Sequence, residues 1–411
     1  MSRFDEPQFE PLLEGLRRHL REERYGTCAR FSYPYAARSF LRYLERREVR
    51  LETVTPAVLE GYLDSRRLKG SRRQYPKQFR RMHRAAIKML LRMICGKWPP
   101  KDLPMSAPER ADREVIDRYE AWMSDLRGLS PNTRRRARAE TRWLLEWMRE
   151  QGKSAATLSV TDLDMYIAQR AEGKQRAGIA EMVSCVRGVL RHLHRSGLIP
   201  LDLAGEITRP TIYALEGIPA TIRAEDIRKV LKVLKQDRTV LGRRDYAIWM
   251  LLTSYGLRAG EIKALKLSDI DWRAERLRIR HAKTGAHSQL PLLRAPAEAL
   301  LSYLRHGRPA SPARAVFLRA QAPYRAFNPN TTLYGIVMRR LAAVGVHPAG
   351  RCGPHALRHA RAVSLLRGGV PLKVIGDVLG HRSERSTAVY LKLATEDLRS
   401  VALDVPSGVT S

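Results

Sequence analysis

The stretch GPHALRHARAVSLLRGG, residues 353–369, predicts one short helix with a polar face. Pro354 suits the first position of a helix, and the two closing glycines are typical stop signals. His355, Arg358 and His359 fall within an arc of about 100°, because successive helical residues are rotated by about 100°. This face, beside the apolar stripe, is consistent with a catalytic cluster or with the solvated edge of a basic helix.

Four further polar residues stand in informative contexts of the C-terminal half. Arg258 follows the glycine that ends the buried helical stretch RDYAIWMLLTSYGL, at the start of the next expected helix. Lys283 lies in a turn-prone Lys-Thr-Gly sequence. His381 follows Gly380, which ends another expected helix, and Tyr390 stands nine residues later in RSTAVYLKL, on an expected short helix.

The stretch RLRIRHAKTGAHSQLPL predicts two short strands joined by the turn that carries Lys283. The alternation in RLRIR has the period of a half-buried strand. The second strand is expected to run through Leu292, and Pro291 confines it to a sheet edge because proline has no N–H to donate. Upstream, Thr221 is the expected cap of the helix TIRAEDIRKVLKVL.

The first 200 residues contain an internal repeat. RSFLRYLERR aligns without gaps on RWLLEWMREQ, 104 residues later, and VTPAVLEGYL falls on LSVTDLDMYI at the same offset. The alignment places Tyr43 on Trp147 and Tyr62 on Tyr166. Apolar residues recur at spacings of three and four residues in both copies, as in amphipathic helices. Duplication is the favoured interpretation; the alternative is two helical segments that resemble each other by pattern alone.

These patterns predict a multidomain chain. Two all-α N-terminal helical domains, residues 1–105 and 106–210, precede a mainly α, α+β domain with a small antiparallel sheet, residues 217–411. The proline-rich GKWPPKDLPMSAPER separates the copies, and helical periodicity stops in LDLAGEITRPTIYALEGIPA before the third domain.

Charge dominates the composition, with 75 Lys and Arg against 42 Asp and Glu, a net charge of +33 and a pI near 10.7. Nucleic acid is the expected partner, because neutralising phosphates releases counterions. A ribosome-associated protein, or a GC-rich genome that favours arginine codons, would also explain the excess. Candidate backbone contacts lie in KGSRRQYPKQFRRMHRAAIK and SPNTRRRARAETR, where a solvated helix face is the alternative. They are Arg72, Arg73, Lys77, Arg80, Arg81, Arg134, Arg135 and Arg136.

The remaining composition excludes other classes. The N-terminus MSRFDEPQFE shows no secretory signal, and the longest apolar stretch is too short and too polar to span a bilayer. Four cysteines lie far apart with no CxxC pair, so neither a zinc site nor a disulfide framework is expected. A cytoplasmic bacterial protein, bound to the nucleoid when it holds DNA, is the expectation.

Arg258, Lys283, His355-x-x-Arg358, His381 and Tyr390, in this order, resemble the catalytic signature of the tyrosine recombinase/phage integrase family. The matching contexts are G-L-R-x-x-E-I, the strand-turn lysine, the H-x-L-R-H box, the L-G-H box and the His-to-Tyr spacing. The helical copies resemble the SAM-like core-binding domain of this family, here doubled. That doubling departs from many members and leaves open what the first copy binds.

The resemblance implies that Tyr390 attacks a DNA phosphodiester and forms a covalent 3′-phosphotyrosine, which conserves bond energy for religation. Arg258 and Arg358 would hold the charged oxygens of the pentacoordinate transition state. His355 would act as general acid/base, since a tyrosine pKa of ~10 requires help with proton loss. His381 would donate a hydrogen bond to the phosphate.

Three more roles follow from the resemblance. Lys283 would protonate the departing 5′ oxygen, unless another basic residue does so. His359 is a supporting group or a direct participant, and Glu261 supports the site by pairing with an arginine. The arginines and the lysine supply the charge that a metal would bring, so neither a metal nor another cofactor is expected.

The combined prediction is a site-specific recombinase that forms a C-shaped clamp on double-stranded DNA. The resemblance implies a homotetramer on two DNA sites, monomeric or dimeric when free, with the tail after Tyr390 exchanged between protomers and accessory proteins possible. Integration or excision of a mobile element is favoured over Xer-like resolution because of the extra helical domain. A type IB topoisomerase and an inert DNA-binding architectural protein are the alternatives.

Overall fold

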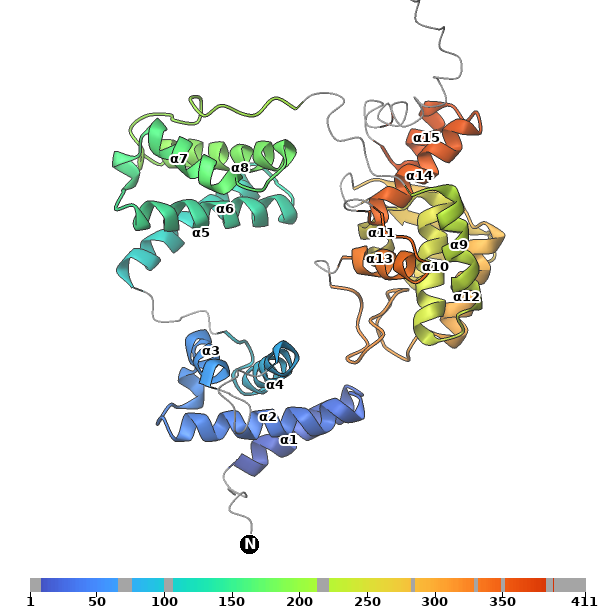
Figure 1. The fold of residues 1–411 in the computed structure, drawn as a ribbon, viewed down its shortest axis with the longest axis horizontal. Helices are drawn as coiled ribbons and strands as arrows, with labels where there is room; N and C mark the ends of the chain where they lie inside the picture. The colour runs from blue at the N-terminus through green and yellow to red at the C-terminus, as the bar shows by residue number, and fades with distance from the viewer. Residues whose placement is uncertain are drawn as a thin grey trace, which may run out of the picture. The chain divides into compact units, whose positions relative to one another are not determined.

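The computed structural model describes residues 9–65, 76–99, 106–212, 222–281, 285–328, 332–348, 352–381 and 387, and it is mostly helical there (Figure 1). The chain forms two compact units, Pro100–Glu216 and a second that groups Met1–Pro99 with Gly217–Ser411. Both ends of the first unit fall in the two segments that the sequence predicts as linkers. The division into three domains stays a prediction.

Four helices and a 3-10 turn make up the first helical copy. They are α1 (Glu10–Glu22), α2 (Thr27–Glu45), η2 (Leu51–Thr53), α3 (Pro56–Ser65) and α4 (Lys77–Cys95). Helix α2 packs against both α1 and α4. Leucines of α1 and aromatic residues of α2 and α3 are fully buried, so each amphipathic helix places its apolar stripe inward.

The second copy repeats this order of elements. It consists of α5 (Ala107–Asp125), α6 (Pro131–Glu150), η3 (Ala155–Thr157), α7 (Val160–Ala171) and α8 (Arg176–Arg195). Helix α6 packs against α5 and α8. Ser106, Ser130 and Ser159 cap α5, α6 and α7 by accepting hydrogen bonds from backbone N–H groups of the first turn.

The aromatic positions predicted to correspond do so in space. The Tyr43 and Tyr62 rings meet edge to face with centroids 5.3 Å apart, and the Trp147 and Tyr166 rings do the same at 5.6 Å. The 3-10 turns η2 and η3 differ in position by the same 104 residues as the aligned sequences. Because both the helix order and the buried contacts repeat, the two copies share one helical scaffold.

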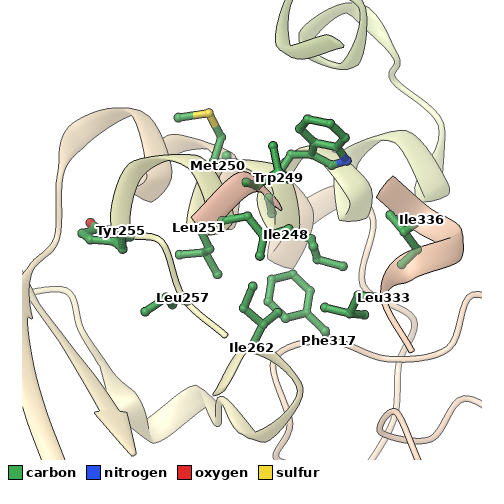
Figure 2. Close-up of a cluster of buried hydrophobic side chains, with 14 of the residues drawn as sticks. Ile248, Trp249, Met250, Leu251, Tyr255, Leu257, Ile262, Phe317, Leu333 and Ile336 are labelled. Carbon is green, nitrogen blue, oxygen red and sulfur yellow. The ribbon is translucent and has the colours of Figure 1, made fainter. Parts of the chain in front are cut away.

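The C-terminal region is built around one buried helix. Its helices are α9 (Ala224–Gln236), α10 (Val240–Tyr255), α11 (Ala259–Ala264), α12 (Arg294–His306), α13 (Tyr334–Ala342), α14 (Pro354–Arg367) and α15 (Leu372–Leu379). Helix α10 packs against α9, α12 and α14. Figure 2 shows Ile248, Trp249 and Leu251 of α10 in a cluster that also includes Phe317 and Ile262. This core fixes the Gly256 end of α10, where the site begins.

A small antiparallel sheet accompanies these helices in the described residues. Its order is β1 (Ile270–Asp271), β2 (Arg276–Arg280) and β3 (His287–Pro291). β2 alternates exposed and buried side chains as predicted, and β3 is an edge strand. β3 ends at Pro291, one residue before the predicted end. β1 was not predicted, because a two-residue strand carries no periodicity.

One predicted cap is wrong. Helix α9 begins at Ala224, so its N-cap is Arg223 and not Thr221, which lies outside the described residues. No side chain caps this end; the Arg223 guanidinium instead pairs with Asp226, three residues on. None of the helices in the described residues has the length and apolarity needed to cross a membrane.

Candidate active site

Arg358 lies in α14, which begins at Pro354 and ends before Gly368 as the sequence predicts. Only 2% of Arg358 is exposed. Its Nη1 donates to the Gly256 carbonyl at 2.8 Å and its Nη2 donates to the Leu379 carbonyl at 2.5 Å. These carbonyls lie at the C-terminal ends of α10 and α15, where helix dipoles place partial negative charge. Arg358 therefore ties two helix ends together, and they offset the burial of its cation.

Arg258 is the N-cap of α11 and is held by a buried carboxylate. Its backbone N–H donates to Glu261 Oε2 at 2.7 Å, its Nη1 to Glu261 Oε1 at 2.8 Å and its Nη2 to the Gly380 carbonyl at 3.2 Å. Burial alone would raise the pKa of Glu261. Hydrogen bonds from His281 and Arg258 outweigh burial and hold that pKa below its usual range. Glu261 thus pairs with an arginine, and the arginine is Arg258.

His281 is a residue of this site that the sequence analysis missed. It is 3% exposed, its Nδ1 lies 2.8 Å from Glu261 Oε1 and its Nε2 lies 2.7 Å from Ser288 Oγ. Gly380, in the left-handed conformation at φ +63°, passes so close that a Cβ there would lie 2.4 Å from His281 Cε1. His281 therefore connects β3, through Ser288, to the Arg258–Glu261 pair. Its ring also packs against the backbone of Gly380, directly before His381.

A sequence signal for His281 exists in the period of the strand. Leu277 and Ile279 are the buried residues of β2, and His281 continues the same inward register directly after the strand. A histidine on the buried face of a strand requires polar partners. The sequence pattern therefore predicts that His281 is buried and hydrogen-bonded, but it does not identify the hydrogen-bond partners.

His381 directly follows Gly380, the C-cap of α15, as the sequence predicts. Its Nδ1 lies 2.8 Å from the hydroxyl of Thr387. Burial, together with the positive charges of Arg358 and Arg258, lowers the pKa of His381 to about 4. Arg258 and Arg358 donate to the consecutive carbonyls of Gly380 and Leu379, so residues from α11, α14 and the end of α15 form one electropositive site. The lowered pKa leaves His381 neutral at pH 7.

The two histidines of α14 have different surroundings. His355 is exposed, and its ring lies with its centroid 6.0 Å from that of His359. His359 is half-buried, and burial with the neighbouring His355 and Arg358 lowers its pKa to about 4. With this lowered pKa, His359 is neutral at pH 7, and its ring lies beside that of the exposed His355. This is the environment of a supporting group, while His355 has access to solvent.

Two of the predicted catalytic residues, Lys283 and Tyr390, lie outside the described residues, and so do Arg72 and Arg73 of the candidate DNA contacts. The structure therefore brings together Arg258, Glu261, Arg358, His381 and His359, with His355 at the exposed end. Within the described part of the chain, no group of three or more His, Cys, Asp or Glu side chains is placed to hold a metal ion.

The remaining candidate DNA contacts lie on two helices. Lys77, Arg81, Arg135 and Arg136 are exposed, and Arg134 is half-buried. Arg80 is committed to its own domain: Nη1 donates to the Leu63 carbonyl at 3.0 Å and Nη2 to Asp64 at 2.6 Å. Arg136 pairs with Glu181, and Arg135 donates to the Asn132 side chain at 2.9 Å.

Two family models match parts of this chain. Residues 220–397 match the model of the phage integrase family, and residues 116–197 match that of the phage integrase N-terminal SAM-like domain. Integrase/recombinase y4rA of Sinorhizobium fredii (strain NBRC 101917 / NGR234) is 35% identical over 299 residues, covering 72% of each chain. Integrase/recombinase y4gC of the same strain is 53% identical over 189 residues, which cover 46% of this chain and 97% of that protein.

A crystal structure of XerH site-specific recombinase, bound to palindromic difH substrate in a post-cleavage complex, shares the fold with a TM-score of 0.56 at 16% identity. The match covers 72% of this chain and 96% of that one. The chain belongs to the phage integrase family of tyrosine recombinases, the site-specific DNA recombinases. The SAM-like match falls on the second helical copy, α5 to α8.

Proposed function

We propose that this recombinase cleaves and rejoins duplex DNA one strand at a time, with Tyr390 as the nucleophile and a 3′-phosphotyrosine as the intermediate. The observation that carries the proposal is the convergence of Arg258 at the start of α11, Arg358 within α14 and His381 directly after α15. Such a site stabilises the transition state by electrostatics that are already in place before the substrate arrives.

The guanidinium groups would hold the phosphate. Protein carbonyls orient both groups, and Glu261 also holds Arg258. Each guanidinium carries five N–H donors, so with DNA bound both would donate to the non-bridging oxygens. Neutral His381 donates a single N–H. If Thr387 donates its hydroxyl proton to Nδ1, the imidazole hydrogen lies on Nε2, which then donates to the phosphate.

Proton transfer would fall to the remaining residues. Tyr390 must lose its proton as it attacks phosphorus, and the 5′ oxygen must gain one as the P–O bond breaks. The solvent-exposed His355 serves as the base toward Tyr390, and Lys283 serves as the acid toward the leaving 5′ oxygen. His359 keeps His355 and Arg358 in place. Religation reverses these transfers when a new 5′ hydroxyl attacks the phosphotyrosine.

Covalent trapping tests the chemistry. Nicked half-site DNA, taken from a site mapped by footprinting in the flanks of the gene itself, is incubated with purified protein. The expected product is a covalent adduct that Tyr390→Phe abolishes. Tyr246→Phe is the matched control, because Tyr246 packs against the core and the adduct should persist. An adduct that survives Tyr390→Phe, or an absent wild-type adduct, would overturn the proposal; the latter favours an inert architectural protein.

The assembly and the biological role are proposed by analogy with the family. We propose that four protomers assemble on two double-stranded DNA sites, and that the protein integrates or excises a mobile element inside a bacterial cell. The doubled helical domain supports a role in moving a mobile element. The second copy carries the SAM-like match of the family, so the first copy is an additional helical domain. A strand-exchange assay with two differently labelled duplexes is the test. Joining of ends from both duplexes supports a recombinase, whereas relaxation without exchange indicates a type IB topoisomerase.

A further inference from the structure

The first helical copy contains a basic hollow that the active site does not explain. It has a volume of about 410 Å³ and lies between the C-terminal half of α2 and the end of α3. Arg42, Arg46 and Arg47 line it together with Ser39 and Ser65. Ser39 and Arg42 of α2 share one face with Arg46, the C-cap of the helix, because positions three, four and seven apart are neighbours on a helix. Within the described residues, no carboxylate lines this hollow.

Two tyrosines give the hollow a fixed floor. The Tyr62 ring is fully buried, and its hydroxyl lies 2.9 Å from His83 Nδ1. The Tyr43 ring meets Tyr62 edge to face, and the Arg47 guanidinium stacks over Tyr43 at 5.0 Å from the ring centroid. Ser65 Oγ donates to the Tyr62 carbonyl at 2.7 Å. The charged groups therefore stand around a floor that is built and rigid.

The second copy provides an internal comparison on the same scaffold. At the 104-residue offset its aromatic floor is retained as Trp147 and Tyr166, but Arg42 and Arg46 are replaced by Glu146 and Glu150. Basic residues near a helix C-terminus also complement its dipole, which is the simplest explanation for the arginines. Helix α6 ends with two carboxylates at these positions, so the scaffold does not require the positive charge. The helical scaffold alone therefore does not explain the positive charge of the first copy.

We infer that this hollow, defined by Arg42, Arg46, Arg47, Ser39 and Ser65, binds a backbone phosphate of duplex DNA. Guanidinium groups match phosphate oxygens bidentately, and the Ser39 hydroxyl adds a donor of the kind that contacts DNA backbones; the Ser65 hydroxyl is already donated to the Tyr62 carbonyl. The inference rests on the proposed function only in taking DNA as the substrate. It gives the first copy a role that positions DNA without reading its sequence, and it places the equivalent face of the second copy away from DNA.

The test measures binding of full-length protein to a 30-base-pair duplex of random sequence by fluorescence anisotropy over a salt series. The variant combines Arg42→Gln, Arg46→Gln and Arg47→Gln. Each lost phosphate contact should lower the slope of log affinity against log salt by roughly 0.9, so the loss of one or two contacts lowers it by about 1–2. Replacing all three with lysine should restore the slope, because lysine retains the charge.

A charge-matched control removes three arginines that already pair with acids. Arg113 pairs with Asp117, Arg118 with Glu114 and Arg294 with Glu298, and their change to glutamine should leave the slope within about 0.5 of wild type. If the triple glutamine variant of the hollow has the same slope as wild type, the inference is wrong. A normal slope with altered self-association in sedimentation assigns the hollow to an acidic protein surface and also overturns it. The two proposals can fail separately. If the variant lowers the slope but the wild-type protein forms no covalent adduct, the hollow is still a DNA-binding site and only the proposed chemistry is wrong.

Discussion

Glu261→Gln tests how much the buried network behind Arg258 contributes to stability. Glu261 is 4% exposed, and its two oxygens meet three nitrogen donors: the Arg258 backbone N–H at 2.7 Å, Arg258 Nη1 at 2.8 Å and His281 Nδ1 at 2.8 Å. Glutamine has the same shape but only one acceptor oxygen. Its amide N–H₂ must face a donor, so at least one hydrogen bond is lost.

The expected cost is about 3 kcal/mol of unfolding free energy. A hydrogen bond to a charged group contributes ~1.5–3 kcal/mol, and removing one partner of a buried ion pair costs ~3–5 kcal/mol. The lower end applies, because 21% of the Arg258 side chain is exposed and water can solvate it. Glu298→Gln is the matched control: Glu298 pairs with Arg294 on the surface, so its removal should cost less than ~0.5 kcal/mol.

The measurement is urea unfolding at pH 7 read by hydrogen exchange of peptides from α10 and α11. This readout reports on the C-terminal region itself, because exchange is measured peptide by peptide. Covalent adduct formation in the same variant reports whether Arg258 is still oriented. If Glu261→Gln unfolds within ~0.5 kcal/mol of wild type, as the control does, the buried network is not a stabilising element and the reasoning fails.

Three further outcomes are expected. Gly380→Ala should abolish the adduct and lower the free energy of unfolding by more than the ~1–2 kcal/mol of left-handed strain, because the new Cβ meets His281. Gly369→Ala is the control: Gly369 has φ +75° and open space around it, so a urea titration should show only the cost of the strain. His281→Phe should destabilise the α10 and α11 peptides, whereas His281→Asn, which keeps a donor for the carboxylate, should recover part of the loss; equal losses would contradict a hydrogen-bonding role. Burial and nearby cations lower the pKa of His359 and His381 to about 4, so the unfolded chain binds more protons below pH ~6.5. Stability should be full above pH ~6.5 and fall toward pH 4, and His381→Gln should flatten that fall in urea midpoints measured across this range.

Local signals in the sequence determined most of the elements that carry the site. Gly256 and Gly380 end α10 and α15 in the left-handed conformation, where glycine escapes the steric cost of a Cβ, so both helix ends were predictable. The alternation of β2, the edge position of β3 and the repeated aromatic residues follow from periods of a few residues. The candidate catalytic residues are recognisable in the sequence because their order and local contexts resemble the linear signature of the phage integrase family.

Only the tertiary structure decided how those residues are held. Arg358 is fixed by carbonyl groups 102 and 21 residues away, and His281 by a carboxylate 20 residues away. Such contacts cannot be predicted from local sequence periodicity, because they form only when the packing of α10, α14 and α15 brings helix ends together. The sequence therefore named the basic residues that are predicted to hold a phosphate. Folding around α10 chose the buried partners, His281 and three backbone carbonyls, that orient those residues before DNA arrives.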